Sequence, residues 1–253
     1  MKIKDFIWNL FHRNKRKTVN LDYPTQWETL SERQFKDVCH ILSIPGIGRE
    51  RALFLCLCKL AGIVPDDARK YDPKKIKGMQ PFRINGEIHL IKAADVAAAC
   101  RELEFIYDSI GLTPSPLKNI DPMLYNVSFD RFFEADSLIL RSSVDKPNAP
   151  KWLKEAAKAL TNGQKRKLEA ADRTALVIWW NGIKKMLKEK YPYVFQEGTG
   201  FSNKTQNEIL HDILACMNGN RPQENENILK APVHDVLDSL NRIYEDAYKK
   251  SHK

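Results

Sequence analysis

Residues 31–48 read SERQFKDVCHILSIPGIG, and this stretch contains a capped helix followed by a tight break. Ser31 can accept a hydrogen bond from a first-turn amide, and Glu32 adds the negative charge that a helix N-terminus favours. The apolar side chains then recur at helical spacing and predict one buried stripe: Phe35, Val38, Cys39, Ile41 and Leu42. The segment Pro45–Gly48 ends this helix, and a second helix is expected from Arg49 to Leu60.

Helical periodicity returns along most of the chain. Further helices are expected at residues 95–110, from Ser128 onward, and at 152–160, 168–190, 204–217, 222–229 and 232–250. The starts at 30–38 and 127–135 align without gaps, each with an apolar residue before a serine and an aromatic residue four positions after it. Alternating apolar residues around Asn85-Gly86 predict a β-hairpin at about residues 82–90. The predicted fold is therefore mainly α, a multi-helix bundle with one small β-hairpin.

The proline-containing residues 146–150 are the best candidate for a linker. They divide the chain into a helical domain with the hairpin at 21–145 and a helical C-terminal region at 151–253. Residues 1–20 form a separate basic amphipathic segment, in which apolar residues at helical spacing precede the cluster Arg13–Lys17. Because so short a helix is marginal on its own, docking of this segment on the rest of the protein is the preferred interpretation. Attachment of residues 1–17 to a membrane surface is the alternative.

The composition is that of a globular protein in a reducing compartment. Of the 253 residues, 43% are hydrophobic and 29% are charged, and the longest apolar run, Ala52 to Cys58, is too short to span a membrane. Asp5 and Asn9 interrupt the N-terminus, so it does not resemble a secretion signal, and a cytoplasmic location is expected. The five cysteines form no C-x-x-C pair and are interpreted as reduced, buried thiols. The alternative is a zinc site with these ligands: Cys39, His40, Cys56 and Cys58.

The net charge of +9 is concentrated in one part of the sequence. Residues 146–190 contain twelve Lys and Arg against four Asp and Glu. In the helix expected at 168–190, Lys184, Lys185 and Lys188 lie away from the apolar stripe. A basic face of this kind attracts nucleic acid, acidic proteins or anionic lipid, and it is also typical of a solvated helix surface.

The break at residues 44–52 resembles the hairpin of helix-hairpin-helix DNA-binding modules. In those modules a P-G-I-G turn brings backbone amides to a phosphate, here from Pro45, Gly46 and Gly48, and Arg49 and Arg51 would add positive charge. The competing interpretation is a structural elbow, since Pro and Gly favour any tight turn between helices. Nucleic-acid binding through this turn and the basic stretch is therefore kept as an alternative function.

The sequence carries no arrangement that predicts catalysis. The six histidines are scattered, and in the pairs His211-Asp212 and His234-Asp235 neighbouring helical residues point about 100° apart. No phosphate-binding or nucleophile-elbow motif is found, so an enzyme, a cofactor and a metal site are not expected. Three tryptophans are candidate anchors for a protein interface: Trp27, Trp179 and Trp180.

Three stretches resemble a group of Bacteroidetes phage and prophage proteins encoded near tail genes. These stretches are residues 23–35 (YPTQWETLSERQF), 177–195 with its Trp-Trp pair and Tyr-Pro-Tyr turn, and 209–240. The resemblance implies a non-enzymatic role in tail assembly, of the assembly-chaperone kind, with other phage structural or assembly proteins as partners. It also implies a location in the host cytoplasm or in the virion, and it brings no catalytic residues.

Overall fold

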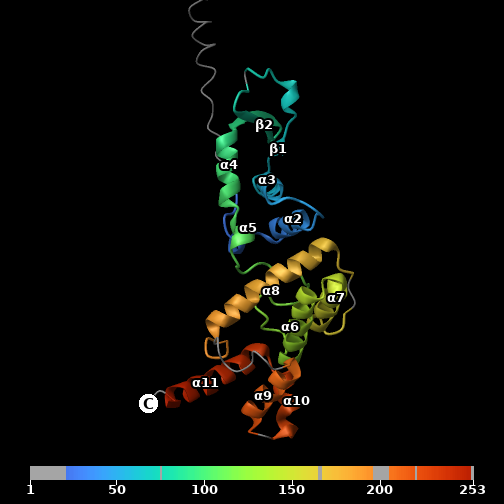
Figure 1. Ribbon diagram of the computed structural model, residues 1–253, viewed down its shortest axis with the longest axis vertical. Helices are drawn as coiled ribbons and strands as arrows, with labels where there is room; N and C mark the ends of the chain where they lie inside the picture. Colours follow the sequence, from blue (N-terminus) through green and yellow to red (C-terminus); the bar gives the residue numbers. More distant parts are fainter. Residues whose placement is uncertain (1–20, 75, 165–166, 196–204, 220, 252–253) are drawn as a thin grey trace, which may run out of the picture.

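The computed structural model describes residues 21–74, 76–164, 167–195, 205–219 and 221–251. The basic segment predicted at residues 1–20 therefore lies outside the described residues. Helices dominate, and short antiparallel strands form one sheet (Figure 1), so the predicted mainly α fold class is confirmed. Three tiers follow the long axis: the sheet and its helices at one end, long helices in the middle and the C-terminal helices at the other end. No described helix is both long and apolar enough to cross a membrane.

The first tier begins with the helices predicted around the Pro-Gly break. A single 3-10 turn, Trp27–Thr29, leads into α2 (Glu32–Leu42), and α3 (Arg49–Leu60) follows the break. Ser31 caps α2 as predicted, because its hydroxyl accepts the Gln34 N–H (3.3 Å). The Gln34 side chain in turn accepts the Ser31 N–H (2.9 Å), which satisfies a second donor at this helix end.

The sheet contains the predicted hairpin and one strand that was not expected. β2 (Met79–Ile84) and β3 (Glu87–Lys92) pair across Asn85-Gly86, and the φ angles of 50° and 86° in this turn fit the predicted type I′ geometry. β1 (Val64–Pro65) adds to the other side of β2, which gives the strand order β1-β2-β3. The predicted hairpin is confirmed, whereas β1 was not predicted, because a two-residue strand is too short to show an alternating pattern.

The helix expected at 95–110 is divided in two. α4 (Ala93–Glu102) follows β3 directly, and α5 (Phe105–Asp108) is a single turn. Between them the backbone tightens: the Leu103 N–H donates to the Cys100 carbonyl (3.2 Å), three residues back. Leu103 is fully buried at this break, which fixes the change of direction against the core.

The middle tier is built on α6 (Phe129–Val144), α7 (Ala149–Leu160) and α8 (Ala170–Lys190). α6 and α7 pack against each other, and α8 packs on α2 and α7. Residues 146–150, the predicted linker, form a 3-10 turn and the first residues of α7. One cluster of buried apolar side chains extends from Trp27 to Leu240, so the division of the chain near residue 146 stays a prediction.

The C-terminal tier agrees with the predicted ranges within a few residues. It contains α9 (Gln206–Asn218), α10 (Asn225–Lys230) and α11 (Val233–Ser251). Two backbone hydrogen bonds join it to the start of α6: the Phe129 N–H donates to the Ala231 carbonyl and the Val233 N–H to the Val127 carbonyl, each at 2.9 Å. This tier is therefore tied to α6 by main-chain bonds as well as by packing.

Candidate binding surface at the sheet end

The sheet presents one face to the core and leaves the other largely exposed. On the inner face Phe82 and Ile91 are buried, and the Phe82 ring lies 6.2 Å from the Phe54 ring of α3. On the outer face Val64, Ile88 and Leu90 expose 60%, 40% and 42% of their surface. The strand register places Val64 and Ile88 on either side of Arg83. Apolar side chains this exposed on adjacent strands are typical of an interaction surface.

A groove lies next to this face, between α2, α3 and β1. Its volume is about 780 Å³, which is within the range of ligand-binding clefts. The apolar part of its lining consists of Ile41, Leu55, Ile63, Val64 and Pro65. Arg33, Asp37 and Lys59 supply charges. Val64 belongs both to the groove and to the outer face of the sheet, so the two form one continuous surface.

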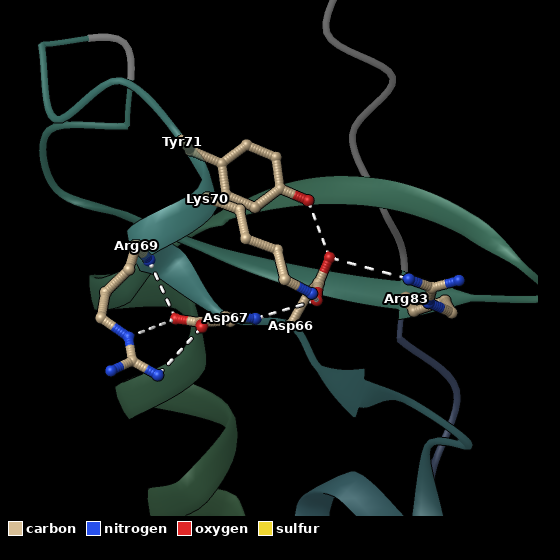
Figure 2. Close-up of polar contacts among 6 residues, drawn as sticks. All are labelled: Asp66, Asp67, Arg69, Lys70, Tyr71 and Arg83. Carbon is tan, nitrogen blue, oxygen red and sulfur yellow. Dashed lines mark hydrogen bonds and ion pairs between the residues drawn. The ribbon is translucent and has the colours of Figure 1, made fainter.

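A network centred on Asp66 holds the loop after β1 (Figure 2). The Asp66 carboxylate accepts hydrogen bonds from the Tyr71 hydroxyl (2.8 Å), the Asp67 N–H (2.9 Å) and the Lys70 Nζ (3.2 Å). Arg83 of β2 lies 3.8 Å from the same carboxylate. The Tyr71 hydrogen bond and the other donors lower the pKa of Asp66 from 3.8 to about 2. The carboxylate is therefore ionised at neutral pH and already surrounded by donors from its own chain.

A second carboxylate in the loop, that of Asp67, also accepts hydrogen bonds from its own chain. Asp67 accepts two side-chain hydrogen bonds from Arg69 (2.9 and 3.0 Å), and these lower the pKa of its carboxyl (Figure 2). Lys74 and Lys77 in this loop and Lys92 at the end of β3 are exposed. These three lysines add positive charge around the sheet, where Glu87 is also exposed.

The predicted elbow is exposed, but its first arginine is engaged within the chain. The Ile47 N–H donates to the Ile44 carbonyl (3.3 Å) and Gly46 has φ +70°, which is the geometry of a type II turn with Pro45 at its second position. Arg49 binds Asp108 (2.5 Å) and lies 4.9 Å from the centre of the Tyr107 ring. The remaining residues of the predicted site are exposed: Pro45, Gly46, Gly48 and Arg51.

The lysines of the predicted basic face point in different directions. Lys184 forms an ion pair with Asp136 of α6 (2.8 Å), and Lys185 donates to the Ile110 carbonyl (2.9 Å). Lys188 is exposed. The structure brings Lys185 and the elbow's Arg49 to the same short segment, residues 108–110, whereas Lys184 lies against α6. Lys184 and Lys185 therefore contact separate parts of the chain.

The three tryptophans predicted as interface anchors are all buried within the described part of the chain. Trp27, Trp179 and Trp180 are each no more than 2% exposed. Their indole N–H groups donate to the Ser109 carbonyl (3.1 Å), the Pro122 carbonyl (3.1 Å) and Asp136 Oδ1 (2.9 Å), respectively. Adjacent tryptophans can both be buried here because α8 is covered on more than one side.

His234 is the most buried histidine described, and its hydrogen bonds indicate a structural role. Its Nε2 lies 2.7 Å from the Met123 carbonyl, which can only accept, so this nitrogen carries the proton. Its Nδ1 then accepts from the Tyr191 hydroxyl at 2.7 Å. Burial lowers the pKa of His234, which favours this neutral form. Both ring nitrogens are engaged, so the imidazole joins α11 to Tyr191 at the end of α8 and to Met123.

Three cysteines of α2 and α3 are buried as free thiols. Burial raises the pKa of Cys39 and of Cys56 to about 12 and that of Cys58 to about 11. His40, the fourth residue of the alternative zinc site, is exposed while Cys39 is buried. In the part of the chain that the structure describes, no three His, Cys, Asp or Glu side chains are arranged to hold a metal ion.

Comparison with known proteins gives no match to a family profile, to a curated protein or to a solved structure. Evidence on function therefore comes from the surface itself, which the sequence alone does not reveal. Alternation around Asn85-Gly86 signals a sheet with two faces, but it does not tell which face the helices cover.

Proposed function

We propose that this protein is a non-enzymatic binding protein that engages other proteins through the surface at its sheet end. The observation that carries this proposal is the outer face of the sheet, where Val64, Ile88 and Leu90 stay exposed beside an apolar groove. Exposed apolar residues that are clustered on one face and bordered by charged groups are typical of protein interfaces.

Two features of the site support binding rather than catalysis. The most buried imidazole, that of His234, has both nitrogens in hydrogen bonds. The buried thiols have raised pKa values, so they stay protonated and weakly nucleophilic at neutral pH. Neither group is poised to make or break a bond in a substrate.

The class of partner is proposed from the resemblance of three stretches to phage tail-region proteins. On that basis the partners are phage structural or assembly proteins, and the protein acts in tail assembly, in the host cytoplasm or in the virion. The sheet-end surface suits such a role because an assembly factor must hold a partner through contacts that can later be released.

A second candidate is nucleic-acid binding through the Pro45–Gly48 elbow, and one observation favours it: the turn is exposed and leads directly into the N-terminus of α3. Two other observations argue against nucleic-acid binding at this turn. Glu50 places a negative charge in the first turn of α3, and Arg49 is paired with Asp108. We therefore rank this candidate second.

The test compares the wild-type protein with Val64→Ser/Leu90→Ser. Partners captured by chemical crosslinking in producing cells would be identified, purified and titrated against both proteins. We expect the double variant to weaken binding at least about tenfold, because two exposed apolar anchors are lost. The matched control is Leu140→Ser/Val144→Ser, which alters two exposed apolar residues of α6, away from the sheet. Equal binding by all three proteins would contradict the proposal.

Gel shifts on duplex and single-stranded DNA test the second candidate. If the elbow binds nucleic acid, binding at low salt must weaken steeply as salt rises and must be reduced by Arg51→Glu. Tight, salt-sensitive DNA binding without any protein partner would place the second candidate first.

A further inference from the structure

The outer edge of β3 carries backbone groups that point away from the sheet. On the β1 side the Pro81 carbonyl accepts the Asp66 N–H (3.0 Å), so the backbone groups of Pro81 face β1. Leu90 is the direct antiparallel partner of Pro81, and Ile88 is the partner of Arg83. Pro81 and Leu90 are therefore a non-hydrogen-bonded antiparallel pair, as are Arg83 and Ile88. In such a pair the two residues direct their N–H and C=O groups away from each other. The backbone groups of Leu90 and Ile88 therefore point to the free edge of β3.

Nothing described in the chain pairs with this edge. Among the described residues, the backbone hydrogen bonds outside helices and strands include none from Glu87–Lys92. The strand order β1-β2-β3 makes β3 terminal in the sheet. Natural proteins protect exposed edges with charges, prolines or bulges, because an unpaired edge is a template for another strand. β3 has one charge of this kind, Lys92, at its end, but its two other outward-facing residues, Ile88 and Leu90, have exposed apolar side chains.

The charges near this edge select an acidic occupant. Lys92 lies on the same face as Ile88 and Leu90, and Arg83, with 54% of its side chain exposed, is the cross-strand neighbour of Ile88. Asp66 is held by Tyr71 and Lys70 and is paired with Arg83, so Lys92 is the cation that a partner would meet. Glu87 lies on the opposite face of β3. A carboxylate opposite Lys92 on an added strand would therefore meet a cation on its own face of the sheet. A second copy of this chain would instead bring its own Arg83 and Lys92 toward the same face.

We propose that β3 pairs with an extended segment of a partner protein, which adds as a fourth strand. That segment carries apolar residues opposite Ile88 and Leu90 and a carboxylate opposite Lys92. Main-chain hydrogen bonds to the β3 edge provide affinity, and the alternating side chains provide specificity. This inference rests on the proposed protein-binding function and specifies its mode and the chemistry of the partner.

A synthetic peptide tests the mode of binding directly. The probe is acetyl-Asp-Glu-Thr-Val-Thr-Val-Ser-amide, which places Glu opposite Lys92 and Val opposite Leu90 and Ile88 when it pairs antiparallel to β3. Titration into the full chain would be followed by ¹H–¹⁵N spectra. We expect saturable shifts centred on Glu87–Lys92. The same peptide N-methylated at the two Val residues keeps its side chains but loses edge hydrogen bonds, and it should leave these signals unchanged.

A pair of variants separates strand addition from side-chain contact. Leu90→Ala and Leu90→Pro both shorten the apolar side chain, but only proline removes the outward N–H, and an edge strand tolerates it. We expect Leu90→Pro to bind the peptide about fivefold to tenfold more weakly than Leu90→Ala, the effect of one lost edge hydrogen bond and the alignment that it provides. Circular dichroism would establish that both variants are folded.

Three outcomes would overturn the inference: equal shifts with the methylated peptide, equal binding by the two Leu90 variants, or saturable shifts away from β3. Shifts of Glu87–Lys92 by single-stranded oligothymidylate, steeply weakened by salt, would also overturn it in favour of nucleic acid. If the crosslinked partner still requires Val64 and Leu90 while the peptide fails, the proposed function stands and only the strand-addition mode falls.

Discussion

Gly182 of α8 lies where its helix backbone closely approaches the backbone of Gly111. A Cβ at this position would meet the Gly111 carbonyl oxygen at 2.2 Å, and a backbone atom cannot rotate away as a side chain can. Gly182→Ala should therefore lower the free energy of unfolding by about 1–3 kcal/mol. Without the contact, a glycine-to-alanine change inside a helix would raise the free energy of unfolding by up to about 1 kcal/mol. The sign of the measured change therefore shows whether the close backbone contact exists. Urea unfolding measures this change. Gly48→Ala, at a position with open space and an ordinary φ, is the control and should change stability by less.

His234 predicts the pH dependence of stability. Burial, and to a smaller degree the nearby Lys190, lowers its pKa in the folded protein below the ordinary value of 6.5. The unfolded chain then binds the proton more tightly, so this contribution to stability is complete above about pH 6.5 and is lost as pH falls through the folded-state value. His234→Gln can still donate to the Met123 carbonyl but does not titrate. Its free energy of unfolding should be lower at pH 7 and flatter between about pH 7 and pH 5 than that of the wild type. Parallel pH profiles would contradict this account.

Two helix starts that look alike in sequence differ in how they are capped. Ser31 accepts the Gln34 N–H, whereas the Ser128 hydroxyl bonds the Asp130 carboxylate and accepts no amide of its helix. Ser31→Ala should therefore lower the free energy of unfolding by about 1 kcal/mol, and Ser128→Ala by clearly less. Chemical unfolding of both variants tests this difference. Equal losses would mean that the local sequence pattern, rather than the observed hydrogen bond, determines the contribution of the cap.

The sequence predicts those helices and strands whose signals are local, and it misses those that depend on distant parts of the chain. Apolar stripes at helical spacing located most of the helices, and Asn85-Gly86 located the hairpin, because both signals are local. β1 and the break at Leu103 were missed because each depends on a partner elsewhere in the chain: β2 for one and the core for the other. The candidate surface was missed for a related reason. The exposure of Val64, Ile88 and Leu90 depends on which face of the sheet α3 covers.

α8 occupies the centre of the whole molecule, and this position bears on the predicted division at residues 146–150. In Figure 1 it crosses between the tier of the sheet and the tier of the C-terminal helices. Phe35 and Cys39 of α2 line the same small cleft as Ala175 of α8, and the Trp180 ring lies 5.4 Å from the Phe132 ring of α6. α2 and α6, which belong to residues 21–145, therefore pack against α8, which lies outside that range.

A stable, separate first domain would need its own complete core. Removing residues 146–253 would expose the α8-facing side chains of α2 and α6, including Phe35 and Phe132, each of which contributes about 1.5–3 kcal/mol when buried. Losses of that size at several positions approach the whole stability of a typical domain. We therefore expect the full chain to unfold in one transition that coincides by tryptophan fluorescence and far-ultraviolet circular dichroism. A chain of residues 21–145 alone should show no cooperative transition. Two separated transitions of the full chain, with the first matched by a folded 21–145 fragment, would instead establish the division predicted from the prolines at 147 and 150.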